Sequence, residues 1–329
     1  LFLVLFLSMT RKQIFAFAAK ILVSAGLIWL IASKVDLGAA KDRLLQVSVP
    51  MLIAGILFFA VQLLIGGVRW KVVTDAIGVR FPLAEAIRLF VIGAFFNQAL
   101  PSSIGGDAVR IYKAYRGGMN LAAAFNGVFL ERAGTVLALL LVVAATQPAL
   151  AGRVAPDMAG ILLAASATAF VVGIGGLVFL AMLHRLPVSL DRFKAIRGFR
   201  AVAADTRRVF FVPGPLARLL VWGVLTHVNL TFAVYLLSLS LDLGITWLDC
   251  LALVPPVILA TTLPISVGGW GVREGAMIYA FGLIGVPADG ALVLSILLGL
   301  VGIVIALPGG VLWFRSGDRR LTLDSETRA

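Results

Sequence analysis

The sequence has one cysteine, two histidines and few charged residues, and each scarcity excludes a class of protein. Only 13% of its residues are Asp, Glu, Lys or Arg, whereas soluble domains have about 25%. The single Cys250 cannot form a disulfide within the chain, and two histidines offer little material for a His-based metal site. We therefore expect Cys250 to be a packing residue, and we expect no metal and no cofactor.

Apolar residues are abundant instead. They make up 61% of the sequence, and the mean hydropathy is +1.05. The net charge is +12, but the basic residues stand in short loops between long apolar runs. A nucleic-acid-binding protein gathers them on one wet face, so we expect no nucleic-acid partner. The pattern is that of cytoplasmic loops and predicts an all-α polytopic membrane protein.

A short polar stretch interrupts the apolar sequence twice. It reads LPSSIGGDAVR at residues 100–110 and LPISVGGWGVR at residues 263–273, with seven of eleven positions identical. A match of this density indicates an internal duplication. Proline and paired glycines interrupt a helix, and non-helical backbone at membrane depth needs surrounding protein or a watery cavity. Each break therefore predicts a cavity.

Loop charge predicts how the two breaks are oriented. Both flanks of the first break are basic, which predicts a re-entrant hairpin around residues 83–118 that enters from the cytoplasm. The basic residues after Phe314 belong in the cytoplasm, and they predict a second hairpin around residues 250–286 that enters from outside. The result is two inverted repeats with about six full transmembrane helices plus two re-entrant hairpins. Full crossing by the arms of each hairpin is the alternative.

The same reasoning divides the chain into five parts. A second span over about residues 50–68 is predicted to close with Arg69, Trp70 and Lys71 as an interfacial anchor. The linker carries eight basic residues against two acidic ones, as either an ordinary loop or an amphipathic helix on the inner leaflet. The parts are a cytoplasmic N-terminus (1–13), a first half (14–183), a basic cytoplasmic linker (184–218), a second half (219–315) and a cytoplasmic tail (316–329).

Both breaks carry residues suited to a phosphate group. A glycine-rich break before a helix exposes N–H groups and the positive end of a helix dipole. An arginine can add bidentate contacts, a serine can add a hydroxyl, and an acid can balance the arginine or bind a cationic headgroup. Internal salt bridges that only hold the hairpins are the alternative. The candidate substrate-binding residues are Ser103, Gly105, Gly106, Asp107, Arg110, Ser266, Gly268, Gly269, Arg273 and Glu274.

Four further polar residues are candidates for cavity support. Asn97 and Gln98 are placed to satisfy free backbone groups of the first hairpin or to contact a headgroup. Glu131 and Arg132 are adjacent, so on a helix they point about 100° apart and cannot simply pair with each other. One is expected to face the cavity and the other a hairpin. Arg110 and Arg273 are expected to approach a common cavity from opposite leaflets.

The two breaks also resemble a known family. Pro-x-x-x-Gly-Gly-Asp-x-x-Arg begins at Pro101, and Pro-x-x-x-Gly-Gly-x-Gly-x-x-Glu begins at Pro264. This pairing resembles the lysylphosphatidylglycerol synthase transmembrane-region family, also called the flippase-like domain family. Arg69 with Trp70, and Glu131 with Arg132, look similar too. The resemblance implies a bacterial or archaeal inner-membrane protein related to the domain that moves aminoacylated phospholipid across the bilayer, and the loop charges place both termini in the cytoplasm.

The resemblance also sets the expected function. Fused synthases of this kind carry a soluble aminoacyltransferase-like domain after the membrane part, whereas this sequence stops shortly after Arg320, so no tRNA-dependent catalysis is expected. We expect a flippase-like lipid transporter rather than an enzyme, acting on a phospholipid or other polar-headgroup lipid, anionic or aminoacylated. Two alternatives are a membrane-embedded transferase that acts on a lipid phosphate, with Asp107 or Glu274 as its base or nucleophile, and a secondary transporter of a small anion. A homo-oligomer or a separate lipid-modifying enzyme is the expected protein partner.

Overall fold

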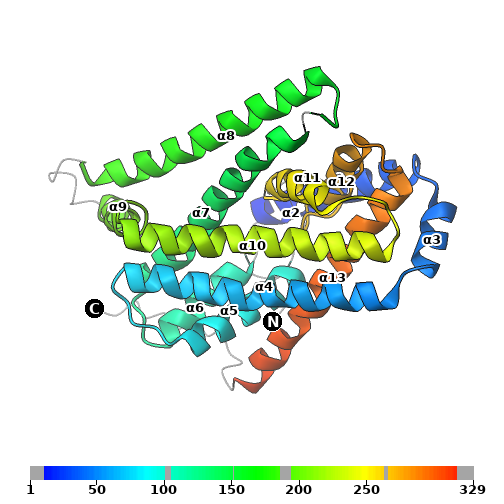
Figure 1. Cartoon of the computed structure of the whole chain (residues 1–329). Coiled ribbons are helices and arrows are strands. Elements are labelled where there is room, and N and C mark those ends of the chain that lie inside the picture. Colours follow the sequence, from blue (N-terminus) through cyan, green and yellow to red (C-terminus); the bar gives the residue numbers. More distant parts are fainter. Residues whose placement is uncertain (1–10, 101–104, 151, 186–193, 263–265, 317–329) are drawn as a thin grey trace.

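The computed structural model describes residues 11–100, 105–150, 152–185, 194–262 and 266–316, which are helical throughout except for short connections (Figure 1). Most of the predicted N-terminal segment and all of the predicted tail beyond Ser316 lie outside these ranges. The elements are α2 (Arg11–Ala32), α3 (Leu37–Leu45), α4 (Val49–Ala76), α5 (Leu83–Ala99), α6 (Gly105–Arg116), α7 (Leu121–Thr146), η1 (Gln147–Leu150), α8 (Pro156–Met182), η2 (Leu183–Arg185), α9 (Lys194–Phe210), α10 (Pro213–Ser240), α11 (Trp247–Thr261), α12 (Val272–Gly282) and α13 (Ala288–Arg315).

Five of these helices are long and apolar enough to cross a membrane, namely α4, α7, α8, α10 and α13. A sixth candidate is the pair formed by Ala18–Ala32 of α2 and Leu37–Leu45 of α3, which bend by 88° at their junction. A spanning helix needs about 20 apolar residues, and the helices on either side of the two breaks are shorter. The prediction of an all-α polytopic membrane protein is confirmed.

The order of helices repeats within the chain. A long helix, two short helices and a long helix occur as α4 to α7 and again as α10 to α13; α4 and α10 have 28 residues each. These two helices run antiparallel, since Ser48 N–H donates to the carbonyl oxygen of Ser240 while Arg69 bonds to Thr226. An inverted duplication requires that equivalent helices of the two halves run in opposite directions, as α4 and α10 do. The inversion of the complete halves, and the re-entrant path of the hairpins, stay predictions.

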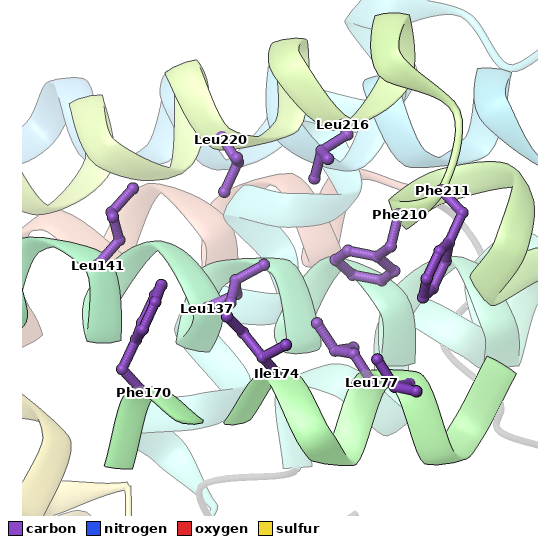
Figure 2. A pocket seen from close by; sticks show the side chains of 10 residues that line it. Leu137, Leu141, Phe170, Ile174, Leu177, Phe210, Phe211, Leu216 and Leu220 are labelled. Carbon is purple, nitrogen blue, oxygen red and sulfur yellow. The ribbon is translucent and has the colours of Figure 1, made fainter. Parts of the chain in front are cut away.

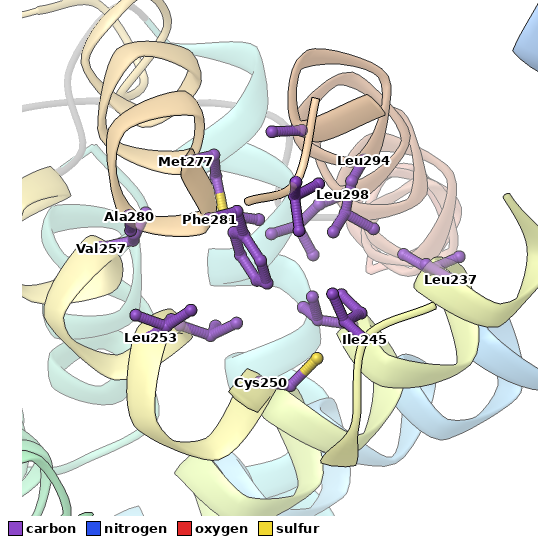
Figure 3. Packing of buried hydrophobic residues seen from close by; sticks show 14 of the residues in the cluster. Leu237, Ile245, Cys250, Leu253, Val257, Met277, Ala280, Phe281, Leu294 and Leu298 are labelled. Carbon is purple, nitrogen blue, oxygen red and sulfur yellow. The ribbon is translucent and has the colours of Figure 1, made fainter. Parts of the chain in front are cut away.

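Each half has its own apolar core. In the second half, α12 packs against α11, so that Leu253 and Val257 of α11 lie beside Met277 and Phe281 of α12 (Figure 3). Cys250 belongs to this core and is fully buried, which agrees with a packing role. In the first half, α4 to α7 pack around other apolar side chains. The first hairpin also contacts the second half, because α5 packs against α13 and Trp313 of α13 belongs to this core.

The predicted interfacial anchor at the end of the second span is wrong. Helix α4 continues to Ala76, and both Arg69 and Trp70 are buried, with exposures of 3% and 0%. An arginine inside the membrane is costly unless it has a partner. Here a buried carboxylate, Glu131, offsets that cost by pairing with Arg69.

The basic linker contains α9, and α8 lies at the edge of the bundle (Figure 1). Helix α9 buries Ala203, Thr206 and Phe210 against the bundle and exposes Arg207 and Arg208. This arrangement is amphipathic, as one of the two readings of the linker expected. Helix α8 packs only lightly on α7 and α9, and it leaves most of its side chains exposed.

Candidate functional site

Five charged side chains meet where α4, α6 and α7 come together. Three are arginines and two are carboxylates, so the cluster carries a formal net charge of +1. Charged groups inside a membrane protein are costly unless they are paired, and every member of this cluster has at least one charged partner. The five residues are Arg69, Asp107, Arg110, Glu131 and Arg132.

Glu131 holds the buried side of this cluster. Its side chain is fully buried, and its Oε1 accepts a hydrogen bond of 2.7 Å from Nε of Arg69. Its Oε2 accepts longer bonds of 3.3 and 3.4 Å from the guanidinium of Arg110. Arg69 also donates to Oγ1 of Thr226 on α10. One carboxylate thus joins α7 to α4, and α4 in turn to α10.

Arg132 and Asp107 form the outward side of the cluster. Nε and Nη2 of Arg132 donate to the two carboxylate oxygens of Asp107, each over 2.9 Å. This bidentate geometry is the strong form of an arginine–carboxylate pair. The Arg132 side chain is nevertheless 45% exposed, whereas that of Asp107 is 11% exposed. Glu131 and Arg132 do not pair with each other; both bond to α6 of the first hairpin, and Arg132 also lines a cavity.

Arg110 is enclosed rather than exposed. Its side chain is 2% exposed, and its guanidinium carbon lies 4.5 Å from the ring centre of Trp70 and 4.7 Å from that of Phe90. It pairs with Asp107 at 3.4 Å, so the internal salt bridge considered as an alternative is present. Its Nε has no hydrogen-bond partner among the described residues. The exposed arginine of this site is therefore Arg132, not Arg110.

A cavity of about 490 Å³ adjoins this cluster. Helices α6, α7, α10 and α11 all contribute to its wall, and the charged side chains on it are Asp107 and Arg132. His227 from α10 also lines it, with Nε2 lying 3.1 Å from the carbonyl oxygen of Thr135. Most of the remaining wall is apolar, including Phe125 and Phe129. The arrangement offers one accessible arginine, paired with Asp107, in a chamber whose wall is mostly apolar.

The glycines of the first break serve close packing. A Cβ on Gly106 would lie only 2.0 Å from the carbonyl oxygen of Gly93, so α5 and α6 approach more closely than a side chain allows. The Gly106 N–H donates to Oδ1 of Asn97 over 2.9 Å, which is the backbone role expected of Asn97. Gly105 begins α6, and Ser103 lies outside the described residues.

The second break is built differently. Gly268, Gly269 and Gly271 have φ values of 60°, 82° and 87°, a region that residues with a Cβ rarely adopt. Helix α12 begins directly afterwards. The N–H of Gly271 donates to Oε2 of Glu274 over 2.6 Å, so the acid closes the start of its own helix. The preceding Ser266 is buried.

Arg273 and Glu274 then pair with each other. Nη2 of Arg273 donates to Oε1 of Glu274 over 2.7 Å, and the hydroxyl of Ser295 on α13 donates to the same oxygen over 3.0 Å. The arginine lines a cavity of about 140 Å³ together with Gln98, Gly268 and Gly269. This second internal salt bridge is balanced in charge.

The structure replaces the expected common cavity of Arg110 and Arg273 with two neighbouring ones. Arg132 lines the larger cavity and Arg273 the smaller, and both cavities are bordered by Ile258 and Thr261 near the end of α11. The separation arises because Arg110 turns into the ion-pair cluster instead of toward the cavity.

Sequence reasoning did not include Arg69, Thr226 or Ser295 among the site residues. Arg69 had a usable signal, because valines at positions 72 and 73 continue the apolar run beyond it. Such a residue lies inside the span rather than at its end. Thr226 and Ser295 had none, since a lone hydroxyl on an apolar helix is common and often bonds to its own backbone.

Comparison with known proteins identifies the family. The family model described as "Lysylphosphatidylglycerol synthase TM region" matches residues 17–310. The matched range is nearly the whole chain and includes both breaks and the charged cluster. A search of curated proteins found no match.

Proposed function

The chain belongs to the lysylphosphatidylglycerol synthase transmembrane-region family, and from this premise we propose that it transports a phospholipid, or another lipid with a polar headgroup, between the leaflets of a bacterial or archaeal inner membrane. The observation that carries the proposal is the position of Arg132. This arginine is 45% exposed on the wall of a chamber between membrane-spanning helices. Ionisable residues at such places mark substrate paths by default.

The charge of the cluster favours an anionic group. The five charged residues sum to +1, so a singly charged phosphodiester in the cavity brings the local sum to zero. A guanidinium matches phosphate geometry with two parallel hydrogen bonds. Arg132 already presents Nε and Nη2 in that geometry to Asp107. The same two donors can pass from the carboxylate to a phosphate.

Asp107 has a complementary part in this proposal. When a phosphate takes the donors of Arg132, the carboxylate of Asp107 loses its strongest partner. A cationic headgroup, such as the ammonium of an aminoacylated lipid, then pairs with Asp107. The exchange leaves no charge unpaired, and an unpaired charge is what makes desolvation of ions prohibitive. Through this exchange, the headgroup can give up its water and take Arg132 and Asp107 as partners at the same time.

The test is lipid translocation in liposomes that contain the purified protein and a fluorescent phosphatidylglycerol. Arg132→Gln removes hydrogen bonds to a charged group worth about 1.5–3 kcal/mol, which corresponds to a rate roughly 10- to 150-fold lower. Arg153→Gln is the matched control. Arg153 has a 44% exposed side chain and pairs with a buried carboxylate, Asp249, away from the cavity. We expect it to keep the wild-type rate.

Three results would contradict the proposal. One is an undiminished rate in Arg132→Gln. Another is chemical conversion of the lipid without a change of leaflet, which would favour a transferase. The third is uptake of inorganic phosphate without lipid movement, which would favour a transporter of small anions.

A further inference from the structure

We infer that an acyl chain of the bound lipid lies in a groove between α7 and α8, while its phosphate lies at Arg132. The inference rests on the proposed function and names the part of the substrate that a soluble anion lacks. We call this cavity, of about 480 Å³, the α7–α8 groove. Its wall includes Val136, Leu137, Leu140, Gly173, Gly176 and Leu180.

The α7–α8 groove adjoins the charged chamber. Phe129, Arg132 and Val136 line both the groove and the cavity of about 490 Å³. Among the described residues that line the groove, Arg132 is the one charged residue, and the others are apolar or glycine. A molecule that spans the junction therefore needs an anionic group at one end and hydrocarbon at the other. That is the chemistry of a phospholipid.

Another cavity on α7 lacks this combination. It has a volume of about 270 Å³ and lies on the far side of Leu137 and Leu177, facing Phe170 and Phe210 (Figure 2). All ten of its lining residues are apolar. It has the shape for hydrocarbon but no contact for a headgroup. The presence of Arg132 is what singles out the α7–α8 groove.

The α7–α8 groove orients the acyl chain of the lipid but contributes little to the binding energy. Lipid tails are as apolar as leucine, so little hydrophobic driving force favours the groove over the surrounding bilayer. The attraction comes from Arg132, and the groove decides where the chain goes once the phosphate is held. Helix α8 suits this role because it packs lightly, with Val172 and Phe179 each more than 60% exposed.

Gly176 makes the inference testable without damage to the fold. A Cβ on Gly176 meets no atom within 4 Å, so Gly176→Leu places a side chain in open space beside the groove. Gly175 is equally open but does not line the groove. Gly175→Leu is therefore a matched control with the same added bulk on the same helix.

The probe is a phosphatidylglycerol with a photoreactive group near the end of one acyl chain, in liposomes of phosphatidylcholine. We expect crosslinks to peptides of α7 and α8 in the wild type. Gly176→Leu should lower their yield several-fold, and Arg132→Gln should lower it comparably. Gly175→Leu should leave the yield unchanged. Unchanged crosslinking in Gly176→Leu, or equal losses in both glycine variants, would overturn the inference.

Translocation measured in the same liposomes separates this inference from the proposed function. If Arg132→Gln stops translocation while Gly176→Leu alters neither translocation nor crosslinking, the groove assignment fails and the transport function stands. If the wild type crosslinks in the groove but moves no lipid, the transport function fails and the lipid site stands.

Discussion

The two breaks share seven of eleven residues, but they build different sites. At the first break, Asp107 and Arg110 bond to residues of another helix, Glu131 and Arg132 on α7. At the second break the charged residues bond mainly to each other and to a backbone N–H at the start of their own helix. The charged residues of the same motif therefore bond to a neighbouring helix in one half and mainly within their own segment in the other.

The two breaks differ because the helices packed against them supply different residues, not because their own motifs differ. Helix α7 supplies a glutamate and an arginine to the first break, whereas α13 supplies a serine and a glycine to the second. A Cβ on Gly299 would lie 2.3 Å from Nη2 of Arg273, so α13 leaves space for this arginine but offers it no charge. Together with Arg69 of α4, the charged residues at the first break have a net charge of +1 beside the larger cavity. The second is neutral beside the smaller one.

The largest expected difference in stability between the two breaks comes from substituting their two buried glutamates. Glu131→Gln leaves Arg69 and Arg110 buried without a carboxylate between them, which costs about 3–5 kcal/mol. Glu274→Gln affects one arginine, which is 12% exposed and adjoins a cavity, and it costs about 1–3 kcal/mol. Thermal unfolding in detergent measures both.

Glu85→Gln is the control for the glutamate pair, because the ion pair with Arg88 is well exposed and is worth about 0–1 kcal/mol. Equal destabilisation by Glu131→Gln and Glu274→Gln would remove the difference between the two networks.

The glycines offer the next largest contrast. Gly106→Ala drives a methyl group into the carbonyl oxygen of Gly93, and overpacking of this kind costs about 1–3 kcal/mol or more. Gly269→Ala finds its nearest neighbour at an ordinary 3.6 Å, so its cost is the left-handed backbone alone, about 1–2 kcal/mol. Gly275→Ala, in open space within α12, is the control, and it should leave stability unchanged or raise it slightly because alanine favours a helix more than glycine does. The midpoint of thermal unfolding should fall most for Gly106→Ala, and a larger fall for Gly269→Ala would contradict the close approach of α5 and α6.

The smallest expected effects come from the hydrogen bonds that anchor each break. Asn97→Ala leaves the N–H of Gly106 without its acceptor, and Ser24→Ala does the same to the N–H of Val267. Each should lower stability by about 1 kcal/mol. Only Asn97→Ala should also slow lipid translocation, because it alone lies at the break beside Arg132. A slower rate in Ser24→Ala with a normal rate in Asn97→Ala would reverse the roles of the two breaks.

Much of the candidate site could be predicted from the sequence because its residues are rare in their surroundings. Asp107, Arg110, Glu131 and Arg132 stand out as charges in apolar segments, and the structure brings all four together. Their order of exposure could not be predicted. Nothing in the sequence distinguishes Arg110 from Arg132. Only the packing of α6 against α7 buries Arg110 and leaves Arg132 exposed.

The sequence by itself determined that this is a helical membrane protein with two related breaks. Apolar length, loop charge and repeated motifs are local properties, and each is visible along the chain without knowledge of any contact. Only the tertiary structure decided which arginine faces the larger cavity and where Arg69 lies. Those outcomes depend on pairs such as Arg69 and Glu131, which are 62 positions apart. Whether a buried charge is tolerable is a property of its partner, and the partner is chosen by the fold.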